Sequence, residues 1–285
     1  MEMESETPSF ECYLGNLDPV WCPGCGDFSV LGAFIEAVRR LRLPSHEIAL
    51  VSGIGCSSRF PFFVKAYGFH GVHGRALPIA QGVKLANPEL TVVVPGGDGD
   101  GLAIGGGHFP HVARNNVDIT YLMFNNSIYG LTKGQSSPTS PASITTKTTP
   151  YGLFGESMNP CVLALAYGAT FVARGAAIKR DHLSQLIEQA IRHTGFSFVE
   201  ILTSCSAFNT KHVTITKVLS RLCYVEQSPD DDMEALRLAS DEQHIHLGVF
   251  RDVERPTLNE HVDHVQQVSQ ESGPAKVTDL LRQFG

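Results

Sequence analysis

Two oxygen-bearing side chains follow apolar segments that are predicted to be strands. Asp98 lies in the loop Gly97-Asp98-Gly99-Asp100-Gly101 after the segment 91–95, and Asn126 lies 28 residues further on, after the segment 118–124. Because the ends of neighbouring strands lie about 5 Å apart, both side-chain oxygens could reach one small cation. Magnesium accepts such ligands and completes its coordination with phosphate oxygens. Alone, either residue would suggest a helix cap or a turn, but together they predict a magnesium and diphosphate site.

Glycine is concentrated around this loop. Thirteen of the 27 glycines fall in residues 53–107, and glycine-rich loops before helices let backbone N–H groups approach an anion closely. The loop is not a dinucleotide fingerprint, because no G-x-G-x-x-G register fits within residues 96–107. The chain also lacks the G-x-x-x-x-G-K-[ST] phosphate loop. What remains is the pair of Asp98 and Asn126 as the predicted metal ligands.

Four of the seven cysteines have settings that could support chemistry. Cys22 and Cys25 form a C-x-x-C pair before a predicted helix, and Cys56 and Cys205 each follow a predicted strand, at the sheet edge where Asp98 is expected. A thioredoxin-like dithiol, a zinc site and an iron–sulfur cluster all use such residues. The segment before the pair does not have a strand pattern, which argues against the dithiol, and four converging thiols beside a cofactor loop favour a cluster. The remaining cysteines are predicted to be structural: Cys12, Cys161 and Cys223.

The elements that must position these residues alternate between helices and strands. Apolar residues recur at helical spacing after Asp27, the predicted N-cap of a first helix that ends before Pro44. Further segments are predicted as helices (76–86, 102–115, 161–168 and 179–194) and as strands (47–53, 91–95, 118–124, 169–174 and 196–202). The strands are apolar throughout, as in a parallel sheet covered on both faces. The expected fold is an α/β doubly wound, mostly parallel sheet, which binds ligands at the carboxyl ends of its strands.

The organisation along the chain is expected to be simple. Residues 1–210 would form the domain that carries the site, and residues 211–285 a C-terminal extension. The polar segment 135–150 is predicted to be a long loop, and such loops in compact domains are usually functional or mobile.

Charge and hydropathy exclude several classes of protein. The 285 residues carry a formal net charge of −7, which argues against binding to nucleic acid or to an anionic membrane surface. Residues 226–285 hold 13 acidic and 5 basic residues, a net −8, so the acidity belongs to the tail. No apolar run approaches the length of a membrane span, and the first residues lack the pattern of a signal peptide. We therefore expect a cytoplasmic protein.

Several motifs together resemble one family. WCPGCGDFSVLGAF, GIGCSSRFPFF, HGRALPIAQGVKLA, the GDGDG loop with the later NN pair, and IYGLTKGQSSPTS occur in that order and cover most of residues 18–206. They resemble the thiamine diphosphate-binding β subunit of 2-oxoacid:ferredoxin oxidoreductases, a family that includes the 2-oxoglutarate and pyruvate enzymes. The fold implied is the sheet of the thiamine diphosphate-binding type.

The resemblance implies three cofactors and their residues. Mg²⁺ would be bound by Asp98, by the Asn126 side chain and by the Ile128 carbonyl, and one [4Fe–4S] cluster by Cys22, Cys25, Cys56 and Cys205. Thiamine diphosphate would be lined by the Mg²⁺ ligands and by Ile54, Gly55, Cys56, Ser57, His73, Gly97, Gly99, Asp100, Gly130, Leu131 and Thr132.

The resemblance also implies a reaction. A 2-oxoacid would be decarboxylated oxidatively with coenzyme A to an acyl-CoA and CO₂, and the electrons would pass through the cluster to ferredoxin. His73, Arg59 and Arg75 are the expected catalytic residues. A second substrate carboxylate asks for an additional cation in the pocket, so 2-oxoglutarate is favoured over pyruvate or another 2-oxoacid. A non-redox thiamine decarboxylase and a zinc-stabilised scaffold remain open as alternatives.

The resemblance finally implies a partner. Thiamine is activated by a glutamate on a homologous pyrimidine-binding domain, and this chain has room for one α/β unit only. An α subunit is therefore expected to supply that domain, within an α2β2 assembly.

Overall fold

The protein is built around one eight-stranded sheet with helices on both faces. In the computed structural model, which describes residues 7–209, 218–272 and 277–283, the strand order is β2-β1-β3-β4-β6-β5-β8-β7. The strands are β1 (Ile48–Ser52), β2 (Tyr67–His70), β3 (Thr91–Gly97), β4 (Thr120–Asn125), β5 (Phe171–Ala176), β6 (Ser197–Leu202), β7 (Leu222–Tyr224) and β8 (Ile245–Asp252). The first six are mutually parallel, and β8 pairs antiparallel with β5 and parallel with β7. The prediction of an α/β doubly wound, mostly parallel sheet is confirmed.

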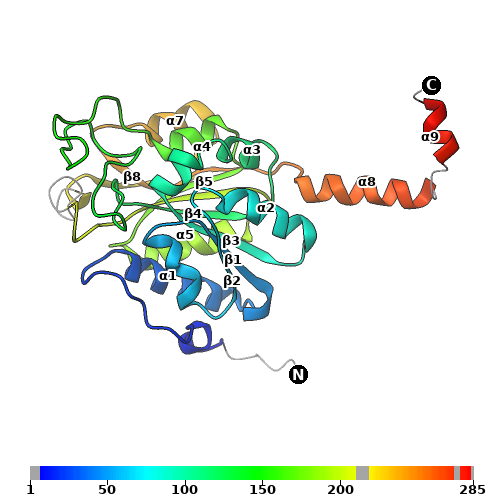
Figure 1. Cartoon of the computed structure of the whole chain (residues 1–285), viewed down its shortest axis with the longest axis horizontal. Coiled ribbons are helices and arrows are strands. Elements are labelled where there is room, and N and C mark those ends of the chain that lie inside the picture. Colours follow the sequence, from blue (N-terminus) through cyan, green and yellow to red (C-terminus); the bar gives the residue numbers. More distant parts are fainter. Residues whose placement is uncertain (1–6, 210–217, 273–276, 284–285) are drawn as a thin grey trace.

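Helices cover the two faces in two layers (Figure 1). The α-helices are α1 (Asp27–Leu41), α2 (Ala76–Ala86), α3 (Phe109–Arg114), α4 (Pro160–Ala166), α5 (Arg180–Arg192), α7 (Asp232–Ala239), α8 (Leu258–Ser272) and α9 (Val277–Gln283). Short 3-10 helices lie at Phe10–Tyr13, Ser45–Glu47 and Ser57–Phe63, and a π-helix at Asp100–Ile104. Helices α1 and α5 pack on one face, whereas α2, α3, α4 and α7 pack on the other.

Alternation along the central strands divides the hydrophobic core into two. In β1, Ile48 and Leu50 belong to the core under α1 and α5, while Ala49 and Val51 belong to the core under α2. Every residue of β1 and of β4 is buried. These strands are therefore rigid supports for the loops that follow them.

The segment 218–257 returns to this sheet. Strand β8 is hydrogen-bonded to β5, and Ala235 and Ala239 of α7 are buried in the core that also contains residues of α4. Beyond it, α8 leads away from the body of the molecule, with its described residues 263–271 exposed (Figure 1). Among the described residues, no helix is both long and apolar enough to cross a membrane.

Two local predictions were wrong. The N-cap of α1 is Gly26, and Asp27 is the first helical residue, with its carboxyl group buried to 1% exposure instead of capping the helix in solvent. The helix predicted over 102–115 is divided into the π-helix and α3, because the glycine run 105–107 separates them. Strand β2, an edge strand whose Tyr67 and Phe69 side chains are exposed, had no clear sequence signal.

Candidate functional site

The candidate site lies where the direction of strand addition reverses. The chain continues from β1 to β2 on one side and then to β3 on the other, and ligands of open α/β sheets bind at such a switch point, outside the carboxyl ends of the strands. The loops that follow β1, β3 and β4 begin at Gly53, Asp98 and Asn126. The predicted cofactor residues therefore come from these three strand ends and, for His73, from the segment after the neighbouring strand β2.

These loops enclose a cavity of about 180 Å³. Its lining consists of Ile54, Gly55, Cys56, Ser57, His73, Gly97, Asp98, Gly99, Asp100, Asn126, Ile128, Tyr129, Gly130, Leu131 and Thr132. The structure thus brings together every residue that was predicted to bind thiamine diphosphate or Mg²⁺. Tyr129 was missed, although it stands between two predicted residues; its hydroxyl group donates to the Gly99 carbonyl at 3.0 Å.

Asp98 is buried in this cavity at 2% exposure. Burial raises the pKa of its carboxyl group, although hydrogen bonds from Ser137 and Thr139 oppose the shift. The Thr139 hydroxyl donates to Asp98 Oδ2 at 2.6 Å, so the long polar loop 135–150 orients this side chain. Among the described residues, Asp98 forms no ion pair with a cation, and a buried carboxylate of this kind has the chemistry of a ligand for a hard cation.

Asn126 and Ile128 are held in one tight loop. The Ile128 N–H donates to Asn126 Oδ1 at 3.0 Å, and Asn209 Nδ2 donates to the Asn126 carbonyl at 2.9 Å. Ser127, between them, has a left-handed φ of 56°. The loop thereby presents two oxygen donors on the same cavity as Asp98, a donor set that fits Mg²⁺.

Asp100 holds two loops in place. Its Oδ1 accepts hydrogen bonds from the N–H groups of Ile54 at 2.9 Å and Gly74 at 2.8 Å, and from His73 Nδ1 at 2.7 Å. A Cβ atom on Gly53 would lie 2.1 Å from Asp100 Oδ2, so only glycine allows this approach. Because a carboxylate only accepts, Nδ1 of His73 carries the proton, and a neutral ring has its lone pair on Nε2.

The segments that carry the four selected cysteines are joined by hydrogen bonds. Trp21 Nε1 donates to the Cys56 carbonyl at 2.7 Å, and Ser206 Oγ donates to the Pro23 carbonyl at 2.8 Å. The C-x-x-C loop is thus fixed to the loops after β1 and β6.

Cys22, Cys25, Cys56 and Cys205 all line a second cavity, of about 230 Å³. Cys56, Asn126, Gly130 and Leu131 line both cavities. A Cβ atom added to Gly130 would lie 3.4 Å from Cys56 Sγ and 3.6 Å from Cys205 Sγ. We call the cavity lined by Asp98 and Asn126 the cofactor cavity, and the cavity lined by the four cysteines the thiol cavity. The two cavities adjoin each other, because single residues such as Gly130 line both.

Burial and nearby negative charge outweigh the positive charge close to these thiols. Burial raises the pKa of Cys56 to about 11, to which the negative charge of Asp27 contributes, and it also raises the pKa of Cys25. Within the described residues, no three of these thiols lie within 4.8 Å of one another, whereas tetrahedral zinc, with bonds of about 2.3 Å, holds sulfur atoms about 3.8 Å apart. Four thiols on one cavity are a ligand set for zinc or for an iron–sulfur cluster.

The two predicted catalytic arginines have different positions. Arg59 lines the thiol cavity, and its charge lowers the pKa of Cys56 against the larger effect of burial. Arg75 lines neither cavity, and its Nη1 donates to the Gly74 carbonyl at 3.2 Å. The geometry therefore favours Arg59 over Arg75 as a substrate-binding cation.

A chain of buried polar contacts leads from this site through the sheet. The single Thr139 hydroxyl proton is shared between Asp98 Oδ2 and Asn125 Oδ1, which lies 2.8 Å from the hydroxyl oxygen, and Asn125 Nδ2 donates to Glu200 Oε1 at 2.7 Å. Glu200 forms an ion pair with Arg174 at 2.7 Å, in which both side chains are buried. The orientation of Asp98 thus depends on residues of β4, β5 and β6.

Comparison with known proteins agrees with this geometry. Residues 53–201 match the family described as thiamine pyrophosphate enzyme, C-terminal TPP binding domain, thiamine pyrophosphate being another name for thiamine diphosphate. This stretch contains every residue that lines the cofactor cavity.

Whole relatives extend the match. The chain is 48% identical over 212 residues to subunit beta of 2-oxoacid:ferredoxin oxidoreductase 2 from Aeropyrum pernix, which covers 74% of this chain and 68% of that protein. It is 38% identical over 248 residues to the 2-oxoglutarate synthase subunit KorB of Methanothermobacter marburgensis, which covers 86% of this chain and 87% of that protein.

A solved structure has the same architecture. It is the 2-oxoglutarate:ferredoxin oxidoreductase from Magnetococcus marinus with 2-oxoglutarate, coenzyme A and succinyl-CoA bound; its matching chain superposes with a TM-score of 0.92 at 39% identity, over 99% of this chain and 98% of that one. With the cavity geometry and the relatives above, this chain therefore belongs to the family of thiamine diphosphate-binding β subunits of 2-oxoacid:ferredoxin oxidoreductases.

Proposed function

We propose that the chain is the β subunit of an enzyme that converts 2-oxoglutarate, coenzyme A and two oxidised ferredoxins to succinyl-CoA, CO₂, two reduced ferredoxins and a proton. The observation that carries this proposal is the pair of adjoining cavities, one lined by Asp98 and Asn126 and the other by four cysteines. A decarboxylase without a redox function has no use for the second cavity.

The residues of the first cavity fit thiamine diphosphate and Mg²⁺. Asp98, the Asn126 side chain and the Ile128 carbonyl would hold the metal, and Gly97 and Gly99 would leave room for the diphosphate. When bound, thiamine diphosphate supplies the electron sink for loss of CO₂ from a 2-oxoacid. His73, held through Nδ1 by Asp100, would present Nε2 as a proton acceptor or donor toward the substrate.

The residues of the second cavity fit a [4Fe–4S] cluster. Cys22, Cys25, Cys56 and Cys205 would be its ligands, and the cluster would carry electrons one at a time away from the cofactor. Buried thiols whose anions are disfavoured in isolation gain from the positive charge of iron.

The preference for 2-oxoglutarate rests on Arg59 and on the relatives. Arg59 is partly exposed in the thiol cavity, close to the residues shared by both cavities, and a guanidinium group binds a carboxylate in two places. The synthase of Methanothermobacter marburgensis and the Magnetococcus marinus enzyme are both named for 2-oxoglutarate.

We further propose how the subunits assemble, how the chain is divided and where the protein is located. An α subunit would supply the pyrimidine-binding domain and its glutamate. Two αβ pairs would form an α2β2 assembly, and ferredoxin would bind to the surface of that assembly. Residues 1–210 would carry the site, and residues 211–285 would be the extension. All seven cysteines are free thiols, which suits the reducing cytoplasm.

The test is anaerobic co-production with the cognate α subunit, followed by assays of iron, thiamine, magnesium and zinc. We expect four iron atoms and one thiamine diphosphate per β chain, and reduction of methyl viologen that requires both 2-oxoglutarate and coenzyme A. The β chain alone, with its cluster rebuilt and with thiamine diphosphate and Mg²⁺ added, should not turn over.

Three results would contradict the proposal. A colourless complex with one zinc per chain would show a scaffold, CO₂ release without acceptor reduction would show a simple decarboxylase, and full activity of the β chain alone would remove the need for an α subunit.

A further inference from the structure

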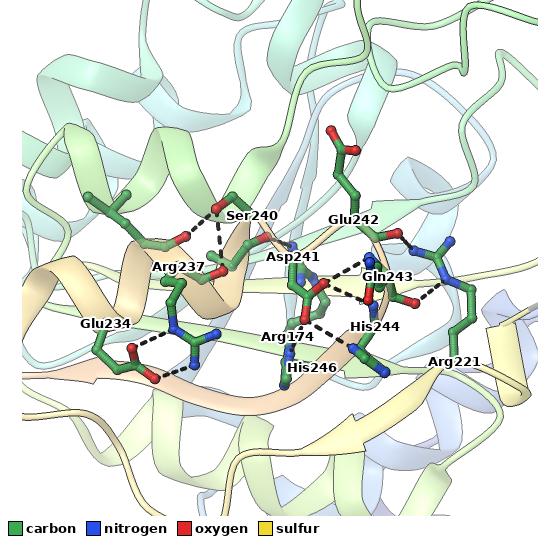
Figure 2. A network of polar contacts seen from close by, with 12 residues as sticks. Arg174, Arg221, Glu234, Arg237, Ser240, Asp241, Glu242, Gln243, His244 and His246 are labelled. Carbon is green, nitrogen blue, oxygen red and sulfur yellow. Dashed lines mark hydrogen bonds and ion pairs between the residues drawn. The ribbon is translucent and has the colours of Figure 1, made fainter.

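A second group of potential metal ligands lies in the turn between α7 and β8 and at the start of β8, among residues that line neither cavity. Asp241, His244 and His246 each offer a ligand atom, and these atoms lie within 4.8 Å of one another. Figure 2 shows both imidazole rings turned toward the carboxylate of Asp241. No part of the proposed reaction uses these three residues.

The two carboxylate oxygens of Asp241 have different partners: one accepts from backbone N–H groups and the other from imidazole nitrogens. Oδ1 of Asp241 accepts from the N–H groups of Gln243 at 2.8 Å and His244 at 3.1 Å. Oδ2 accepts from His246 Nε2 at 2.9 Å and from His244 Nδ1 at 3.2 Å. One cation in place of those two ring protons would contact a carboxylate oxygen and two imidazole nitrogens at once.

The surroundings hold the three groups before any ion arrives. His246 is part of β8, where it is paired with Cys223 of β7, and only 14% of its side chain is exposed. Arg221 donates through Nε to the Gln243 carbonyl at 2.9 Å and through Nη2 to the Glu242 carbonyl. The turn is therefore held by β8 and by Arg221, the residue just before β7 (Figure 2), and little ordering remains to oppose binding.

We propose that Asp241, His244 and His246 form a binding site for one divalent transition-metal ion, with Zn²⁺ as the reference ion. Two imidazole nitrogens and one carboxylate oxygen suit Zn²⁺, Ni²⁺ or Cu²⁺, whereas Mg²⁺ and Ca²⁺ prefer oxygen ligands alone. His244, with 51% of its side chain exposed, leaves an open path for the ion and for a water molecule as a fourth ligand. The bound ion would fasten the end of α7 to β8.

The test uses the complete α/β holoenzyme with its cluster and with thiamine diphosphate and Mg²⁺ present, passed over a chelating resin. Zn²⁺ is added in isothermal titration calorimetry, and the bound ion is then examined by X-ray absorption. We expect one additional Zn²⁺ per β chain, with nitrogen and oxygen but no sulfur in its coordination shell. His246→Ala and His244→Ala should each weaken binding by more than the roughly 10–100-fold that loss of an outer hydrogen-bonding partner costs.

His46→Ala is the matched control, because His46 is an exposed imidazole beside a carboxylate, that of Glu47 at 3.8 Å, and it should bind Zn²⁺ as the wild type does. If His246→Ala disturbs the fold by circular dichroism, the half-exposed His244 variant decides. The proposal is overturned if the wild type binds no Zn²⁺ at micromolar concentration, if sulfur appears in the coordination shell, or if both histidine variants bind as tightly as the wild type.

Discussion

At the scale of single residues, the position of Arg59 predicts how the enzyme chooses its substrate. Arg59→Ala should raise the KM for 2-oxoglutarate about tenfold or more, since a charge-assisted hydrogen bond contributes about 1.5–3 kcal/mol, while the KM for pyruvate changes little. Steady-state kinetics with both acids measures this. Arg75→Ala is the control, because Arg75 lines neither cavity. Equal effects of Arg59→Ala on both acids would remove the specificity role.

The hydrogen bonds of Thr139 lead to a second prediction at the residue scale, which concerns the binding of Mg²⁺. Thr139→Val removes the donor to Asp98 Oδ2 and to Asn125 Oδ1, so the Mg²⁺ concentration needed to bind thiamine diphosphate should rise about 10–100-fold. Fluorescence quenching by thiamine diphosphate during a Mg²⁺ titration measures this. Thr139→Ser keeps the hydroxyl group and should restore most of the affinity; an equally weak serine variant would point to packing as the cause.

At the scale of elements, the ion pair between β5 and β6 predicts a large loss of stability. Arg174→Met leaves Glu200 charged and buried, which should cost about 3–5 kcal/mol in the free energy of unfolding. Urea unfolding measures this. Arg174→Met combined with Glu200→Gln removes both charges and keeps an acceptor for Asn125, so it should recover at least half of the loss. No recovery would mean that packing of the Arg174 side chain dominates.

The ion pair of Arg174 and Glu200 also predicts how the free energy of unfolding depends on pH. Burial alone would raise the pKa of Glu200, but the Arg174 charge and the hydrogen bonds lower it overall. In the wild type, this stabilisation is present above the ordinary pKa of about 4.3 and is lost as the pH falls through the lower folded value. In Arg174→Met, burial raises the pKa of Glu200 instead. The loss in the free energy of unfolding relative to the wild type should therefore become smaller as the pH falls from 8 to 6. A constant deficit would contradict this assignment.

The elements also show what the sequence could and could not predict. Apolar runs such as 91–95 and 118–124 identified β3 and β4, because both faces of these strands are buried. The thiols and the oxygen donors were placed together because parallel strands end at one edge. The prediction that Asp27 is the N-cap was wrong. An acidic residue just before an apolar helical pattern can be either the N-cap or the first residue of the helix, and the sequence does not distinguish the two. The contacts of Thr139 and Tyr129 join distant segments, and spacing along the chain does not encode them.

At the scale of the whole molecule, α8 predicts how the chain meets its partner. Residues 263–271 are exposed and include Val265 with 53% of its surface accessible. A chain that ends after Val262 keeps the reciprocal hydrogen bonds of Thr257 and Glu260 at the start of α8. We expect its thermal stability to change little, while its association with the α subunit, measured by analytical ultracentrifugation, becomes weaker. Unchanged association would remove α8 from the interface.

The exposed edge of the sheet has a consequence for how cells must produce this protein. Strand β2 ends the sheet, and its Tyr67 and Phe69 side chains reach into solvent. An open strand edge with apolar side chains is a template for aggregation, and a partner that covered β2 would remove this template. Balanced synthesis of the two subunits, more than the stability of either one, would then set the yield of active enzyme, and an excess of this chain would be the fraction that precipitates.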